Sequence, residues 1–393
     1  MVAGIVCEYN PFHNGHNYHI TETKKKADYI VCVMSGNFVQ RGDCAYLDKW
    51  TRAKLAVLHG ADLVIDLPVP WSNASAETFA RGSIGLLGAF GVDIISFGSE
   101  TDDIGQLKKC ADIHSDPVVI TASKEFMMQG NTYPSALCKA TEKFYGRKTA
   151  DILSTANNTL AVEYIKAAKS LGFTFDFLTV KRYGTHHDSN EITTNTASAS
   201  KIRSMGICND ITGVISPATF EVLKSLQQEN LAPCSLSNCE RAILSCLREI
   251  KKDDYALYIS DTQGLATRIY ESVRTAESLQ MLYENAKSKN YTLSRIRREF
   301  LSLYLKIEKD LSSGIPPYIR ILAANEKGLT LLGKTKDKAT LPVVTKHSEM
   351  LTLGEKAKKI YDLQCSSTDK FALCSKKIRE CGLEQKKSMI ILK

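Results

Sequence analysis

The chain has 393 residues, of which 44% are hydrophobic and 24% are charged, a balance typical of a globular protein with a sizeable core. No segment approaches the roughly 18 to 20 consecutive apolar residues of a membrane-spanning helix, and no basic and then apolar N-terminal segment suggests a secretory signal. The twelve cysteines include no C-x-x-C pair. This pattern favours reduced thiols in a cytoplasmic protein over a disulfide framework or a zinc site.

Five short apolar segments in the first 200 residues have the character of buried β-strands. They span residues 1–9, 29–36, 61–69, 92–100 and 175–183. Helical patterns separate them, and two of these, at 46–60 and 75–91, end in glycine. Strands that alternate with helices predict an α/β fold with a doubly wound, parallel, five-stranded sheet of the Rossmann-like kind. Such sheets bind ligands beyond the carboxyl ends of their strands.

The pattern of apolar and charged residues changes near residue 210, so we divide the chain into residues 1–210 and 211–393. The second part has helical apolar spacing and dense charge, with a loop and a short α/β unit at 313–334. The first part holds 21 basic and 22 acidic residues, whereas the second holds 30 and 21. A mostly helical region with this excess of positive charge suggests an anionic partner such as nucleic acid, although a solvated basic surface is the alternative.

The segment His13-Asn14-Gly15-His16 follows the first predicted strand and begins a helical pattern. Free N–H groups and the helix dipole favour anions at a helix N-terminus, and Gly15 leaves room for a phosphate to approach. Two histidines three residues apart share one helical face, where both can donate hydrogen bonds to phosphate oxygens. We therefore predict that His13 and His16 stabilise charge during attack on a nucleotide α-phosphate. A zinc-binding pair is the rival, but no further ligand is evident.

A second segment, "TASASKIRSMG" at residues 196–206, reads as a helix that caps its own N-terminus. Ser198, Ser200 and Arg203 stand close enough to bind the β- and γ-phosphates of a nucleotide. An ordinary helix cap with a surface arginine is the alternative. Together, the two segments resemble the signature pair of the HIGH-type nucleotidyltransferase superfamily, whose members form adenylates from ATP and release pyrophosphate.

Longer motifs narrow the resemblance. The segments "EYNPFHNGHNYHI", "MSGNFVQRGD", "DKWTRAKLAVLHGADLVIDLPVPW", "FGSE" and "KIR" are similar to those of the tRNA(Met) cytidine acetate ligase family over about the first 205 residues. Two local departures, "ANNTLA" and "ASASKIR", keep the polar groups of the family pattern.

This resemblance implies an enzyme that activates acetate as acetyl-adenylate and acetylates the wobble cytidine of elongator tRNA(Met). The nucleotidyltransferase domain would be residues 1–210, and residues 211–393 would bind tRNA. ATP would be the nucleotide substrate, with Mg²⁺ as its usual companion. In addition to the signature residues, the implied ATP contacts are Cys7, Glu8, Tyr9, Asn10, Pro11, Phe12, Asn14, Gly15, Asn17, Tyr18, His19, Ile20, Gly98, Asn157 (with Asn158 as the alternative) and Arg182.

Several polar residues near these motifs are expected to contact substrate or tRNA. They are Asn37, Gln40, Arg41, Lys49, Arg52, Arg295, Arg297 and Arg298. Solvated helix faces explain Lys49 and Arg52 equally well, and an amphipathic core helix with a charged outer face explains the arginines near Tyr304. Glu8 is expected to orient substrate or to make a structural hydrogen bond, and Asp43 to begin a helix. We expect no protein-bound metal; His186, His187 and Asp188 fit a loop or phosphate contacts better.

Two other functions stay open. A small-molecule adenylyltransferase would explain the phosphate motifs but not the basic region. An RNA-binding protein with a vestigial nucleotide site would explain the basic region but not the intact histidines and Arg203.

Overall fold

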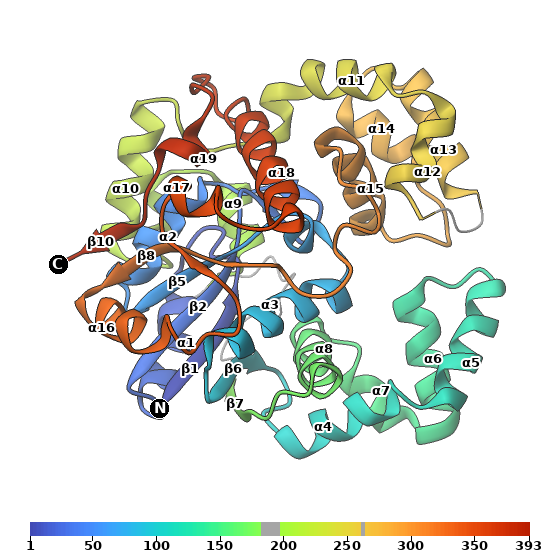
Figure 1. Cartoon of the computed structure of the whole chain (residues 1–393). Coiled ribbons are helices and arrows are strands. Elements are labelled where there is room, and N and C mark those ends of the chain that lie inside the picture. Colours follow the sequence, from blue (N-terminus) through green and yellow to red (C-terminus); the bar gives the residue numbers. More distant parts are fainter. Residues whose placement is uncertain (182–196, 261–263) are drawn as a thin grey trace.

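A computed structural model describes residues 1–181, 197–260 and 264–393. Its centre is an eight-stranded sheet in the order β10-β8-β5-β2-β1-β6-β7, with β9 paired to β8 (Figure 1). The strands are β1 (Val2–Cys7), β2 (Tyr29–Ser35), β5 (Leu63–Leu67), β6 (Ile94–Ser99), β7 (Asp176–Lys181), β8 (Ile319–Asn325), β9 (Val343–Val344) and β10 (Ile390–Leu392). A small hairpin of β3 (Phe38–Val39) and β4 (Asp43–Cys44) lies outside this sheet.

The five predicted strands are confirmed, and they pair in parallel in the order β5-β2-β1-β6-β7. The predicted strand count is wrong, because β8, β9 and β10 extend the same sheet from the C-terminal part of the chain. The short α/β unit predicted at 313–334 corresponds to β8 and the helix that follows it. The antiparallel pairing of β8 with β5 was not predicted, because that contact joins segments more than 250 residues apart.

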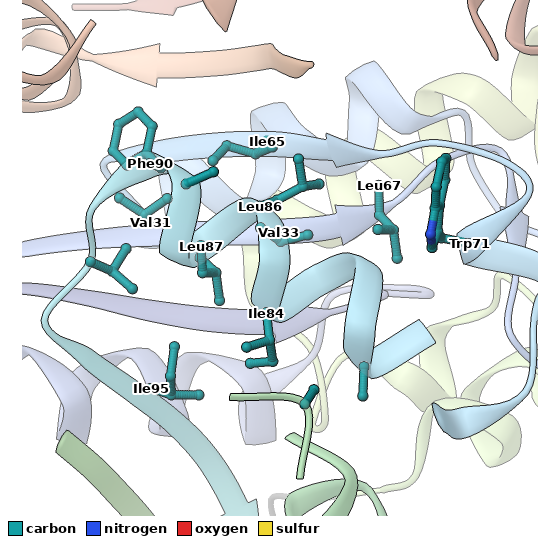
Figure 2. Packing of buried hydrophobic residues seen from close by; sticks show 14 of the residues in the cluster. Val31, Val33, Ile65, Leu67, Trp71, Ile84, Leu86, Leu87, Phe90 and Ile95 are labelled. Carbon is teal, nitrogen blue, oxygen red and sulfur yellow. The ribbon is translucent and has the colours of Figure 1, made fainter. Parts of the chain in front are cut away.

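Both faces of the sheet are covered, which explains why its strands are continuously apolar. Alternate side chains of β2 belong to different cores: Val31 and Val33 face one, and Ile30 and Cys32 face the other. Figure 2 shows the first core, where side chains of β2 and β5 meet Ile84 and neighbouring residues of α3. A parallel sheet buried in this way brings the carboxyl ends of its strands to one edge.

The first part of the chain holds nine α-helices among its described residues, and several of them cover the sheet. The nine helices are α1 (Asn14–Lys24), α2 (Lys49–Leu58), α3 (Ala76–Phe90), α4 (Ile104–Ile113), α5 (Pro117–Met128), α6 (Tyr133–Tyr145), α7 (Arg147–Ile152), α8 (Ala156–Leu171) and α9 (Ala199–Met205). The predicted helices at 46–60 and 75–91 are found as α2 and α3 with shorter bounds.

The second part of the chain is rich in helices, as predicted. They are α10 (Pro217–Gln228), α11 (Glu240–Glu249), α12 (Tyr255–Tyr258), α13 (Leu265–Thr275), α14 (Leu279–Ala286), α15 (Leu293–Leu305), α16 (Glu326–Thr335), α17 (His347–Met350), α18 (Glu355–Phe371) and α19 (Leu383–Lys386). Helices α11 to α15 form a unit with its own apolar core beside the sheet (Figure 1). Within the described ranges, no helix combines the length and hydrophobicity needed to cross a bilayer.

Helices α5 and α6 form a hairpin that projects from the body of the molecule (Figure 1). A small apolar cluster holds it together, with Ile113 of α4, Val119 of α5 and Leu137 of α6 among its members. His114, at the end of α4, is 5% exposed, and among the described residues neither ring nitrogen has a hydrogen-bond partner. Burial, together with the charge of Lys166, lowers the pKa of His114 to about 4.

This buried histidine predicts acid sensitivity. Because the folded-state pKa of His114 lies below its unfolded value, the unfolded chain binds the extra proton as the pH falls below about 6.5, and stability decreases. Between pH 7.5 and pH 5, wild type should lose about 2 kcal/mol more of its free energy of unfolding than His114→Leu. Urea denaturation of both proteins at the two pH values measures the difference. Equal losses in the two proteins would show that His114 does not titrate in this way.

Candidate functional site

His13 and His16 lie at the N-terminus of α1, directly beyond the carboxyl end of β1. His13 is the N-cap, and its Nδ1 accepts a hydrogen bond from Gly15 N at 3.1 Å. His16 Nδ1 accepts from His13 N at 3.3 Å, which completes a capping box. The two rings stack with centroids 3.6 Å apart. The predicted strand–turn–helix setting of the motif is therefore confirmed.

These hydrogen bonds to backbone N–H groups determine which nitrogen of each neutral ring carries the proton. A neutral imidazole that accepts at Nδ1 carries its proton at Nε2. Both histidines consequently present an Nε2–H donor on the side of the ring away from the helix cap. Stacked donors at a helix N-terminus suit a phosphate group, because the helix dipole favours negative charge at the same place.

The second signature segment meets the first through Arg203. Ser198 caps α9 by accepting from Lys201 N at 3.1 Å, and its hydroxyl lies 3.0 Å from that of Ser200, as the self-capping pattern predicts. Arg203 Nη1 donates to Asn10 O at 2.6 Å, in the loop that leads to His13. Burial lowers the pKa of Arg203, and the nearby carboxylates of Glu8 and Asp43 oppose this shift and favour its charge.

Residues 7 to 20 divide into a buried scaffold and an accessible part. Tyr9, Asn10, Pro11, Phe12 and Ile20 are buried. Tyr9 and Phe12 place their rings 4.9 and 5.6 Å from that of His16, so they pack against this ring instead of lying open to a nucleotide. His19 Nε2 lies 2.9 Å from Ser96 Oγ on β6. Cys7, Glu8, Asn14 and Gly15 are half-buried at the cap, and Asn17 and Tyr18 are exposed on the following turn.

The "MSGNFVQRG" segment runs from the end of β2 through β3 to the turn before β4, and the β3–β4 hairpin packs against α15. Gln40 N donates to Glu8 Oε1 at 2.9 Å, so Glu8 makes the structural hydrogen bond that was one of its two interpretations. Gln40 O accepts from Arg298 Nη1 at 3.2 Å. Gly42 has a φ of +74°, and a Cβ there would lie 2.5 Å from Arg298 N. The hairpin, with half-buried Arg41 at its turn, is thus held between the site and the helical unit.

Asp43 does not begin a helix, contrary to the prediction. It lies in β4, and α2 starts six residues later, where Asp48 caps it by accepting from Thr51 N. Burial raises the pKa of Asp43, while Arg297 and Arg203 lower it. The hairpin itself therefore carries a half-buried carboxyl group near two arginines.

Lys49 and Arg52 lie in the core, which neither interpretation of them foresaw. Both are 0% exposed, so neither meets tRNA or solvent in this structure. Arg52 binds backbone carbonyls, with Nη1 2.7 Å from Glu8 O and 3.0 Å from Ser35 O, and a further bond to Gly36 O. Lys49 Nζ lies 2.5 Å from Asp66 Oδ2.

Asn37 is also structural. It is 3% exposed, its Oδ1 accepts from Lys49 N at 2.9 Å, and its Nδ2 lies 3.3 Å from Thr368 Oγ1 on α18. Its amide is engaged on both sides and does not face an open site. The sequence indicated that this segment is unusual, but one partner of each residue, Thr368 for Asn37 and Glu384 for Lys49, comes from the distant C-terminal part of the chain.

The three arginines of α15 have three different surroundings. Arg295 lies over the ring of Tyr291 at 4.9 Å, and Arg297 lies over that of Tyr283 at 5.3 Å. Arg298 holds the hairpin through Gln40, as described above. Tyr304 is 1% exposed and belongs to the core of the helical unit, so it is not available for stacking on bases. Helix α15 is thus an amphipathic core helix whose charged side reaches the site.

Two of the remaining ATP contacts implied by the resemblance, Gly98 and Asn157, lie close to Glu100 in the chain or in space. Gly98, in β6, is half-buried. Asn157 Nδ2 donates to Glu100 Oε1 at 2.5 Å. Asn158 is 1% exposed, and its amide binds Ser99, Thr101 and other groups of the same turn, which favours Asn157 as the accessible residue of the pair. Arg182 and the segment His186-His187-Asp188 lie outside the described residues.

Sequence reasoning missed two structural partners of the site. Glu100 stood inside the quoted "FGSE" motif, and its position directly after a parallel strand was a usable signal. Glu384, which lies 2.7 Å from Lys49 Nζ, had no local signal.

Comparisons with known proteins identify the family. The family model described as HIGH Nucleotidyl Transferase matches residues 1–386. A protein of Thermoanaerobacter sp. (strain X514), named tRNA(Met) cytidine acetate ligase, is 38% identical over 394 residues and covers 98% of each chain. A protein of the same name from Acetivibrio thermocellus is 34% identical over 413 residues and covers 100% of each. The chain belongs to the tRNA(Met) cytidine acetate ligase family.

Solved structures agree with this assignment. The apo form of Thermotoga maritima TmcAL has a TM-score of 0.93 and 30% identity, and the match covers 100% of both chains. The same protein bound with alpha-thio ATP has a TM-score of 0.91 and 31% identity over 99% of each. The predicted α/β class and the predicted family are thereby confirmed.

Proposed function

We propose that this protein is an ATP-dependent acetate ligase that acetylates the wobble cytidine of elongator tRNA(Met). The observation that carries the proposal is the stacked pair His13 and His16, whose Nδ1 atoms make the helix cap so that both Nε2–H groups lie on the other side of the rings, joined through Asn10 to Arg203 of the second signature segment. This arrangement suits a triphosphate. The family supplies the identity of the other substrates, because its members are named for acetate and tRNA(Met).

The reaction has two steps. In the first, an acetate oxygen attacks the α-phosphorus of ATP, the bond to the β-phosphate breaks, and pyrophosphate leaves. His13 and His16 would donate to α-phosphate oxygens, where negative charge increases, and Arg203 with Ser200 would bind the leaving phosphates. In the second, the exocyclic amine of cytidine attacks the acetyl carbon, the amine loses a proton, and AMP leaves.

Glu100 and Asn157, together with Gly98, would bind the adenosine part of ATP at the carboxyl end of β6. Arg41 lies at the hairpin turn, where it would meet acetate or the incoming base. Arg295 and Arg297 would attract the RNA backbone, and the basic excess of residues 211–393 supports this role.

Magnesium would arrive with the nucleotide. Among the described residues, no three His, Cys, Asp or Glu side chains group closely enough to hold a metal ion. The site therefore fits Mg²⁺ bound mainly by ATP phosphates, as is common for this ion. When bound, it would neutralise phosphate charge. The cytoplasmic location likewise stays a prediction from cysteine usage.

Acetate-dependent exchange of pyrophosphate into ATP tests the proposed function. We expect exchange with acetate and ATP that is absent without acetate. Exchange that requires a phosphorylated metabolite instead would support the adenylyltransferase alternative. Tight tRNA binding without any exchange would support a vestigial nucleotide site.

A further inference from the structure

We propose that the corner between α6 and α7, residues 143–148, is an RNA-binding surface that holds the substrate RNA beside the nucleotide site. The proposal rests on the proposed function, because it names a second contact for the same RNA. It places this contact in the first part of the chain, apart from the basic C-terminal region.

The corner combines positive charge with exposed aromatic rings. Its sequence is Lys143-Phe144-Tyr145-Gly146-Arg147-Lys148, with three basic and no acidic residues. Phe144 is 45% exposed and Tyr145 is 40% exposed. Lys143 Nζ lies 5.1 Å from the centre of the Phe144 ring. Exposed rings interleaved with cations suit RNA, because bases stack on the rings while the cations bind phosphates.

The apolar core of the α5–α6 hairpin does not include the rings of Phe144 and Tyr145. Its cluster includes Leu137 and Ala140 of α6 but neither Phe144 nor Tyr145. The Tyr145 hydroxyl donates to Asp116 Oδ2, which fixes that ring, and Arg147 lies only 4.0 Å from Asp151 in an exposed pair of little energetic weight. Phe144 is thus left at the surface beside Lys143, and neither Lys143 nor Lys148 makes an ion pair among the described residues, although Glu142 precedes them in the chain.

The corner lies close to the nucleotide side of the site along the chain. Helix α7 has six residues and so is about 9 Å long. It leads from the corner to the turn where Asn158 Nδ2 donates to Ile152 O and Asn157 binds Glu100. An RNA strand on the corner would therefore lie one short helix away from the nucleotide side of the site.

The other end of the hairpin touches the helical unit. A Cβ on Gly130, between α5 and α6, would lie 3.4 Å from Asn290 Oδ1, in the connection before α15. The hairpin therefore links α8 to the unit that carries Arg295 and Arg297. RNA bound to both surfaces would be held from two sides.

The test compares tRNA affinity among full-length variants. Fluorescence anisotropy with an elongator tRNA(Met) transcript is measured for wild type and for the triple variant Lys143→Ala, Arg147→Ala, Lys148→Ala. We expect Kd to rise about tenfold or more and the slope of log K against log salt to fall in magnitude by about 2 to 3. The matched control is Lys24→Ala, Lys25→Ala, Lys26→Ala, which removes three exposed charges where α1 ends, at the opposite edge of the sheet.

A second variant tests the ring. Phe144→Leu keeps an apolar side chain but removes stacking, so Kd should rise about fivefold or more. Acetate-dependent exchange without RNA should equal that of wild type in every variant, which separates this inference from the proposed function. Unchanged affinity in the corner variants, or equal losses in the control, would overturn the inference. So would a change in self-association of Phe144→Leu without loss of tRNA affinity, since it would assign the corner to a second copy of the chain.

Discussion

Replacing His13 by asparagine is expected to lower acetate-dependent ATP–pyrophosphate exchange by about 100- to 1,000-fold while leaving α1 intact. Asparagine is a favoured N-cap, and its Oδ1 occupies the place of the imidazole Nδ1 that accepts from Gly15 N. The change therefore keeps the cap and removes the ring, with its Nε2–H donor and its stacking on His16. His16→Asn should behave alike, because His16 Nδ1 also accepts a backbone hydrogen bond.

Stability provides the control for this prediction. The free energy of unfolding of both asparagine variants should remain close to that of wild type, whereas His13→Ala should lose about 1 kcal/mol with the cap. An asparagine variant that keeps its fold and exchanges at the wild-type rate would show that the ring donors do not stabilise the transition state.

Replacing Lys49 by methionine is expected to lower the free energy of unfolding by about 3 to 5 kcal/mol. Lys49 Nζ lies 2.5 Å from Asp66 Oδ2 and 2.7 Å from Glu384 Oε1, and these side chains are at most 2% exposed. Methionine keeps the unbranched stem but leaves two carboxylates with Arg320 as their nearby cation. Urea denaturation measures the loss.

Two further variants make the Lys49 experiment decisive. Lys25→Met removes an ion pair of similar length, 2.6 Å from Glu22, but this pair is at the surface, and we expect little change. Adding Asp66→Asn to Lys49→Met should restore part of the loss, because it removes the surplus buried charge. Equal, small losses in the free energy of unfolding of Lys49→Met and Lys25→Met would mean that the buried carboxylates need their lysine no more than the exposed Glu22 does.

The same network predicts a pH dependence. Burial opposes ionisation of Glu384, but Arg320 and Lys49 outweigh it and hold the pKa of Glu384 below its ordinary value of 4.5. This stabilisation is therefore present at neutral pH and is lost as the pH falls through the range below about 4.5. The contribution of Glu384 adds to the loss from His114, which begins at higher pH, whereas burial raises the pKa of Asp66, whose contribution has the opposite sign.

The predictions from sequence succeeded where the signal is local. The five parallel strands, the capped start of α1 and the self-capping of α9 each follow from a few adjacent residues, and the structure confirms them. Long motifs also identified the family. A continuous apolar strand needs no knowledge of its partner, because both faces of the sheet are covered.

Sequence reasoning failed where a residue's role depends on distant partners. Lys49 and Arg52 show helical spacing that suits a charged surface, yet Glu384 and the carbonyls of the β1 and β2 ends draw them inward. Arg298 looked like an RNA contact, and it binds a loop 258 residues away. The place of β8 and β10 in the sheet was not predicted for the same reason, because pairing between strands far apart in the chain leaves no local sequence pattern.

Transfer of labelled acetate to RNA tests the central claim most directly. The enzyme is incubated with ATP, labelled acetate and either elongator tRNA(Met) or the same transcript with uridine in place of the wobble cytidine. We predict label in the first RNA, none in the second, and none in either with His16→Asn. Equal label in both RNAs, or none in the first despite acetate-dependent exchange, would contradict acetylation of the wobble cytidine.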